Sequence, residues 1–108
     1  MNTGNKNQRK RRDRLYIIAE ILEIARDGTL KTQIMYKANL SFSQLNEYLD
    51  FLVKLNLLES KEMNGRTIYK TTEKGLKYLD NYKEILQLLK NTKNDVKKLS
   101  VNWINNLR

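Results

Sequence analysis

Positively charged side chains are concentrated near the start of the chain, where they could pair with the phosphates of a polyanion. The 108 residues include 21 Lys and Arg against 12 Asp and Glu, for a formal net charge of +9. The first fourteen residues hold more than half of that excess. A polyanionic partner is therefore the first hypothesis, with a solvated basic tail as the open alternative. The candidate contacts in this segment are Arg9, Lys10, Arg11, Arg12 and Arg14.

Other chemistry is excluded by composition. The chain has no His and no Cys, so it lacks imidazole bases, thiolate nucleophiles and the usual zinc ligands. Its acidic residues form no catalytic pair, and its glycines match no phosphate-binding loop. We expect no enzyme, no metal site and no cofactor.

No membrane-spanning or export segment is expected. The longest apolar run, residues 15–19, is far shorter than the roughly 20 residues that cross a bilayer. We expect a soluble chain with no membrane partner.

The elements that would position the charges begin with three helices. Apolar spacing predicts a helix over residues 12–27 that ends at Gly28. Thr29 can cap a second helix over 30–38, which Asn39 would end in the left-handed conformation. Ser41 can cap a third helix over 42–56. Two short helices so closely spaced indicate a helix-turn-helix. The apolar face predicted for the third helix consists of Phe42, Leu45, Leu49, Leu52 and Val53.

A hairpin is predicted directly after this third helix. Residues 57–62 and 67–71 read as strands, and Asn64-Gly65 between them is a strong hairpin signal. A hairpin in this position is the wing of a winged helix. The expected fold class is mainly α with a small β-hairpin (α+β): a basic flexible arm over 1–11, a winged helix-turn-helix over 12–72 and a long helix over 73–108.

The last helix, capped by Thr72, carries an apolar repeat in alternating steps of three and four. This pattern predicts a homodimer through an antiparallel two-stranded coiled coil. Parallel pairing would place Lys93 against Lys93 in the seam, and a helix folding back on its own domain is the remaining alternative. The predicted dimerisation residues are Leu79, Tyr82, Leu86, Leu89, Val96, Leu99, Trp103 and Leu107.

If the polyanion is duplex DNA, further candidate contacts lie on the wing and at the helix starts. Lysines and arginines of the wing suit phosphates, helix starts offer free amides, and amide side chains can pair with adenine edges. For Ser41, capping is favoured over a base contact. The candidates are Lys31, Thr32, Ser41, Ser43, Gln44, Asn46, Glu47, Lys61, Arg66 and Lys70.

Three stretches carry a resemblance to a known family. Residues 31–41 read Lys-Thr-Gln-Ile-Met-Tyr-Lys-Ala-Asn-Leu-Ser, followed by Tyr48-Leu49 and by Thr72-Glu73-Lys74-Gly75. Together they resemble the archaeal ten-a (10a) family, over residues 15–107. The resemblance implies small winged-helix proteins of chromatin or transcriptional-regulator type that bind double-stranded DNA as two-fold dimers. It also implies a nucleoid-associated, cytoplasmic location.

One departure from the family qualifies the DNA hypothesis. The exposed face of the third helix shows Glu47 and Asp50, with only Lys54 positive. Carboxylates repel phosphates, although one can accept a hydrogen bond from cytosine N4 in the groove. The alternative is a protein-interaction module on a winged-helix scaffold with weak or no DNA binding. RNA binding also stays open.

Overall fold

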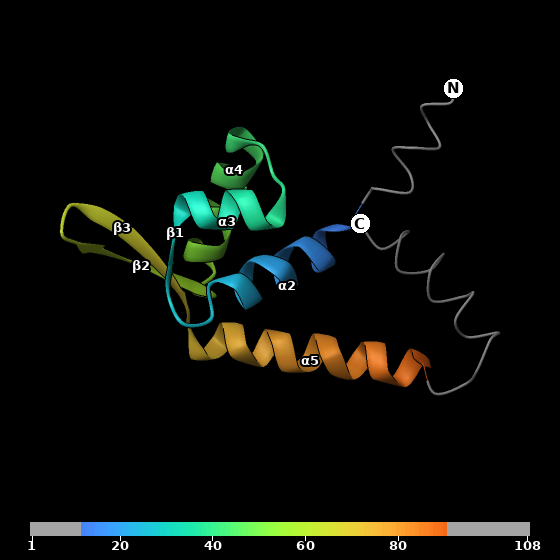
Figure 1. The fold of residues 1–108 in the computed structure, drawn as a ribbon. Coiled ribbons are helices and arrows are strands. Elements are labelled where there is room, and N and C mark those ends of the chain that lie inside the picture. Colours follow the sequence, from blue (N-terminus) through green and yellow to red (C-terminus); the bar gives the residue numbers. More distant parts are fainter. Residues whose placement is uncertain (1–11, 91–108) are drawn as a thin grey trace, which may run out of the picture.

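The computed structural model describes residues 12–90 and places them in a winged helix with a C-terminal helix (Figure 1). The order along this part of the chain is α2, β1, α3, α4, β2, β3, α5. The helices are α2 (Arg14–Ile24), α3 (Lys31–Ala38), α4 (Phe42–Lys54) and α5 (Glu73–Lys90), and the strands are β1 (Thr29–Leu30), β2 (Leu58–Met63) and β3 (Arg66–Thr71). The expected class, a mainly α winged helix with a small β-hairpin, is confirmed.

Local capping signals explain most helix boundaries. Asp13 begins α2, since its side chain accepts a hydrogen bond from the Tyr16 amide at 2.8 Å. Asn39 ends α3 in the left-handed conformation, at φ 56°. The Thr72 hydroxyl accepts from the Gly75 amide at 3.0 Å and so caps α5, as predicted.

The first helix ends earlier than expected, and Thr29 has a different role. Helix α2 stops at Ile24, and residues 25–27 form a turn before Gly28, whose φ is 98°. Thr29 does not cap α3, because it pairs with Tyr69 in the strand β1. The position before α3 belongs to Leu30, which has no side chain able to accept a capping hydrogen bond.

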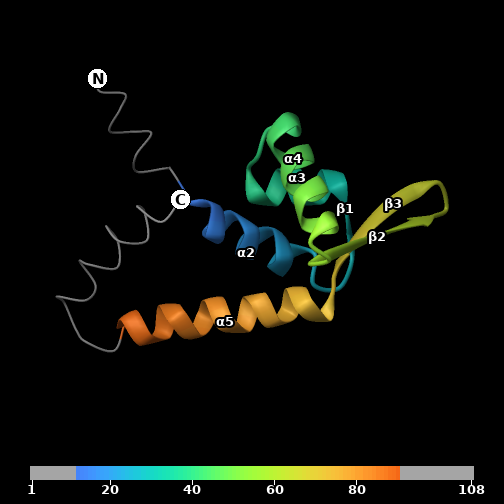
Figure 2. The ribbon, with the colours of Figure 1, turned by 180° about the vertical axis from the view of Figure 1, so that it is seen from behind.

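The wing is a two-stranded hairpin with a tight turn. Asn64 and Gly65 both adopt positive φ, at 52° and 78°, which is the geometry that the right-handed twist of a hairpin favours. The three-stranded antiparallel sheet has the order β1-β3-β2, so β3 is central. The view from behind in Figure 2 shows the hairpin projecting away from the helices.

The core lies between α2, α3, α4, the base of the sheet and the start of α5. Its largest fully buried side chains are Ile21, Leu22, Ile34, Leu45, Leu52, Leu58 and Leu79. The stripe predicted for α4 is correct at Leu45, Leu49 and Leu52 and wrong at its ends. Phe42 is 59% exposed and Val53 38% exposed, because the helix faces the core along a narrower stripe than the sequence suggested.

Helix α5 packs along α2 before it extends beyond the domain (Figure 1). Leu79, assigned above to the dimer seam, is instead only 2% exposed within the single chain, so it belongs to the chain's own core. Tyr82 packs at the edge of that core and stacks on Tyr78, with ring centroids 6.2 Å apart. The fold-back alternative is therefore correct for the first turns of α5.

The rest of the predicted seam divides into two groups. Leu86 and Leu89 are half-buried near the end of α5, next to the exposed Ile85 and Leu88. The remaining seam residues Val96, Leu99, Trp103 and Leu107 lie outside the described residues. Within residues 12–90, no helix combines the length and apolar character needed to cross a bilayer.

Candidate nucleic-acid interface

The helix after the turn, α4, presents a polar and acidic surface to solvent. Ser43, Glu47 and Asp50 are exposed opposite the buried stripe, whereas Asn46 is half-buried. The acidic character that the sequence indicated is thus a property of the folded surface.

Ser41 and Gln44 form two reciprocal hydrogen bonds at the start of α4. The Ser41 hydroxyl accepts a hydrogen bond from the Gln44 backbone amide at 3.1 Å. In return, the Gln44 side-chain carbonyl accepts one from the Ser41 backbone amide at 3.1 Å. This capping box confirms the capping role of Ser41. Because bidentate pairing with adenine needs both the amide oxygen and the amide nitrogen, Gln44 in this conformation offers mainly its nitrogen.

The start of α3 carries a cation held by an aromatic ring. The Lys31 ammonium lies 4.5 Å from the centroid of the exposed Phe42 ring, within the range of a cation–π contact. Thr32 beside it is exposed. Lys31 thus keeps a fixed positive charge beside the first turn of α3.

The register of the hairpin determines on which side of the wing each charged residue lies. Cross-strand partners share a face, and the pairs Lys61–Ile68, Met63–Arg66 and Glu59–Lys70 alternate with pairs on the other face. All three wing cations therefore lie on one side. We call this side, made of Glu59, Lys61, Met63, Arg66, Ile68 and Lys70, the cationic wing face.

The opposite side of the wing is turned toward the core and carries the carboxylate of Glu62 but no cation. Thr67 donates a hydrogen bond to Glu62 at 2.7 Å, and Tyr69 packs against the core. Burial raises the pKa of Tyr69, and the carboxylates of Asp50 and Glu62 raise it further. The two faces of the wing thus differ in charge.

The basic segment near the N-terminus is only partly described. Arg9, Lys10 and Arg11 lie outside the described residues. Arg12 forms an ion pair with Glu20 at 2.6 Å and donates to the Asn39 carbonyl at 3.3 Å, so it is tied to the domain rather than free to extend with an arm. Arg14 is exposed on the first turn of α2.

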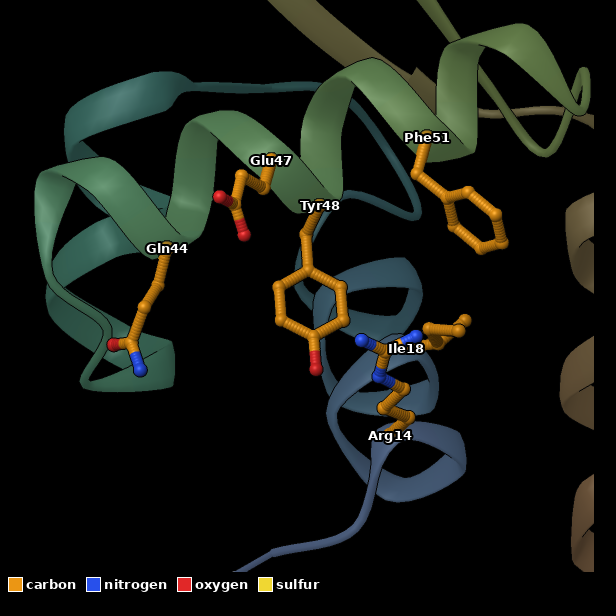
Figure 3. Close-up of a pocket in the computed structure, with 6 residues that line it drawn as sticks. All are labelled: Arg14, Ile18, Gln44, Glu47, Tyr48 and Phe51. Atoms are coloured by element: carbon orange, nitrogen blue, oxygen red, sulfur yellow. The ribbon is translucent and has the colours of Figure 1, made fainter. Parts of the chain in front are cut away.

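A groove that the sequence analysis missed separates α2 from α4 (Figure 3). It has a volume of about 360 Å³. The α4 residues that line it follow helical spacing along one flank of the helix, which is the signal that could have indicated it. The lining residues are Arg14, Ile18, Gln44, Glu47, Tyr48 and Phe51.

No group of three or more potential metal-binding side chains occurs within residues 12–90. The polar surfaces of this part of the chain are charged faces without a metal-ligand cluster.

Comparison with known proteins identifies the fold family. A family model described as winged helix-turn-helix matches residues 11–90. The chain belongs to this winged helix-turn-helix family.

Individual winged helix-turn-helix relatives come from archaea. The uncharacterized protein MJ0287 of Methanocaldococcus jannaschii is 32% identical over 89 residues, covering 82% of this chain and 88% of the relative. A second protein of that organism, MJ0290, is 32% identical over 80 residues, and the match covers 73% of this chain but only 36% of that longer relative.

Solved winged helix structures give the same result. Sso10a-2, a DNA-binding protein from Sulfolobus solfataricus, has a TM-score of 0.70 and 30% identity, over 82% of this chain and 94% of that one. This match confirms the resemblance inferred from residues 31–41, 48–49 and 72–75. MepR, a transcription regulator of a Staphylococcus aureus efflux pump, shares the fold at 13% identity with a TM-score of 0.65, over 92% of this chain and 80% of that one.

Proposed function

We propose that the chain binds double-stranded DNA as a homodimer and acts in chromatin organisation or transcriptional regulation. The cationic wing face on a winged helix-turn-helix scaffold is the observation that carries this proposal. Lys61, Arg66 and Lys70 share one side of a projecting hairpin, where they can neutralise neighbouring phosphates together. The similarity to the DNA-binding protein Sso10a-2 supports the same function.

In this proposal α4 enters the major groove, and the wing and the basic segment contact the backbone or the minor groove. Lys31, Thr32 and Arg14 contribute phosphate contacts beside the helix starts. Ser43 and Asn46 reach base edges, and Glu47 accepts from cytosine N4. Because Glu47 and Asp50 repel phosphates, affinity comes mainly from the wing and the basic segment.

Homodimerisation belongs to the same proposal. Ile85 is 50% and Leu88 69% exposed near the end of α5, after Tyr82, which packs against the core. Exposed apolar side chains at this spacing favour pairing with a second copy. The proposed contact continues through Leu86, Leu89 and the seam residues beyond α5.

The experiment is a salt titration of binding to a duplex by fluorescence anisotropy. Binding through phosphates gives a linear fall of log affinity with log salt, with a slope of about 0.9 per neutralised phosphate. Binding that is absent at low salt, or insensitive to salt, would contradict the proposal.

A protein-interaction module is the second candidate, and the acidic surface of α4 favours it. Changing Glu47 and Asp50 together to Lys distinguishes the two functions. A DNA binder gains affinity for the duplex, whereas a module that recognises a basic protein surface loses its partner without gaining DNA affinity.

A further inference from the structure

The groove between α2 and α4 has the features of a small-ligand site. Its volume of about 360 Å³ falls within the usual range of small-molecule pockets, which begins at roughly 300 Å³. Figure 3 shows the Tyr48 ring reaching down from α4 toward Arg14 and Ile18 of α2, with Phe51 farther along the same helix.

The charges in the groove are separated. Arg14 comes from α2 and Glu47 from α4, and the two form no ion pair within residues 12–90. Asp13, next to Arg14 in the chain, accepts a hydrogen bond from the Tyr16 backbone amide at 2.8 Å, and Glu20, the first acidic residue within α2, pairs with Arg12 at 2.6 Å. Arg14 therefore retains a full set of guanidinium donors with no carboxylate partner in the described part of the chain.

The remaining walls combine apolar surface with the hydroxyl of Tyr48 and the side-chain amide of Gln44. Ile18 is almost fully buried beneath the groove, whereas Phe51 is 47% exposed and offers its ring to an occupant. Burial raises the pKa of Tyr48, although Arg14 lowers it, so the phenol stays protonated at neutral pH and can donate a hydrogen bond.

We propose that this groove binds a small aromatic carboxylate. The carboxylate pairs with the Arg14 guanidinium, which suits bidentate recognition of a planar anion. The ring of the ligand packs on Tyr48 and Phe51, for which flat aromatic surfaces are the best partners. Glu47 disfavours a second negative charge at the other side of the groove and so selects monoanions.

Ligand binding directly affects the surface that is proposed to contact DNA. Gln44, Glu47, Tyr48 and Phe51 all belong to α4, and Arg14 is one of the cations assigned to DNA. An anion on Arg14 removes a phosphate contact, so ligand and DNA compete, and each weakens the other by the same factor. This consequence rests on the proposed function, whereas ligand binding itself does not.

The test titrates the full chain with sodium benzoate in the absence of DNA and follows backbone amide shifts by NMR. Two probes separate the contributions: benzamide keeps the ring without the charge, and cyclohexanecarboxylate keeps the charge without the flat ring. We expect saturable shifts for benzoate at residues 14–18 and 44–51, and weaker binding of both other probes.

Two variants and one control locate the site. Arg14→Gln should weaken benzoate binding about tenfold, the equivalent of about 1.4 kcal/mol. Glu47→Gln should strengthen it, because the repelling carboxylate is gone. Arg26→Gln is the matched control, since Arg26 lies beyond the far end of α2 and pairs with Glu23 at 3.0 Å. It should leave benzoate binding unchanged.

The proposal is overturned if benzoate gives no saturable shifts, if Arg14→Gln binds it as well as the wild type, or if benzamide binds equally well. A failure here leaves DNA binding untouched, because the salt titration measures that separately. If benzoate binds but does not weaken DNA binding, the site stands and its competition with the duplex is rejected.

Discussion

The buried hydroxyl of Thr71 donates a hydrogen bond to the backbone carbonyl of Leu22, 2.6 Å away. In a continuing helix this carbonyl would accept from the Arg26 amide, but that amide bonds to Glu23 instead. Thr71 thus satisfies the carbonyl left free where α2 ends, and its own amide bonds to Ala25 at 3.0 Å. The base of the wing is fixed to α2 by these two contacts.

Changing Thr71 to Val should destabilise the fold. The substitution keeps the shape but leaves a buried carbonyl without a donor, at a cost of about 1–3 kcal/mol. Thr67→Val is the control, because its bond to Glu62 is exposed at the wing. Urea unfolding of both variants checks the prediction, and equal losses would contradict it.

Gly75→Ala should also destabilise the protein, although alanine usually favours helices. A Cβ at this position would collide with the Leu57 carbonyl oxygen and would lie 2.6 Å from the Thr71 methyl. Forcing α5 away from the sheet costs about 1–3 kcal/mol, more than the helix propensity returns. Asn81→Ala, on an exposed position of α5, is the control. A melting temperature for Gly75→Ala at or above the wild-type value would show that the helix can shift freely.

Stability should fall at alkaline pH because of the tyrosines between α2 and α5. Burial raises the pKa of Tyr82 to about 12 and also raises that of Tyr78. Below about pH 10, both folded and unfolded chains keep these protons; above it the unfolded chain loses them first, so stability decreases as pH rises toward 12.

Tyr82→Phe tests this dependence, since it keeps the stacked ring and removes the titrating hydroxyl. Urea unfolding from about pH 8 to about pH 11 should show a shallower alkaline decline than in the wild type. Tyr36→Phe, at a side chain that is 85% exposed, serves as the control. Identical curves for Tyr82→Phe and wild type would refute the assignment.

The cationic wing face makes a prediction for DNA binding. Changing Lys61, Arg66 and Lys70 one at a time to Gln should lower the salt slope by about 0.9 per protomer, because each variant leaves one phosphate without its cation. Lys77→Gln makes the same charge change on α5 and should leave the slope near the wild-type value. If Lys77→Gln has the same effect as the wing variants, total charge rather than the wing face governs binding.

The dimer prediction concerns the end of α5. Leu89→Asp places a charge in the proposed seam and should yield monomers in sedimentation experiments. Gln87→Asp puts the same charge at an exposed polar position of the helix and should keep the dimer. An unchanged mass for Leu89→Asp would reject the assigned contact, provided that circular dichroism shows an intact domain.

Local signals were sufficient for much of the fold. The Asn64-Gly65 turn, the Ser41 cap and the left-handed Asn39 each depend on a few neighbouring residues, and each was predicted correctly. The role of Thr29 was not, because the choice between a helix cap and a strand depends on Tyr69, far along the chain.

The same difference between local signals and long-range contacts explains which parts of the candidate site could be predicted. Periodicity showed that Leu79 faces an apolar surface but not whose surface it is, and the structure assigns it to the chain's own core. The side of the wing that carries Lys61, Arg66 and Lys70 follows from register alone. The helical spacing of its α4 residues indicates one wall of the groove, but the position of α2 and Arg14 opposite that wall follows only from the fold.

Because β3 occupies the middle of the sheet, no strand within residues 12–90 pairs with the outward border of β2 along the projecting hairpin. Such a border invites a foreign strand to add to it. Charges of both signs lie along this border, at Glu59, Lys61 and Glu62. An incoming strand would have to bury or match them. These charges disfavour the addition of a second strand to the projecting hairpin.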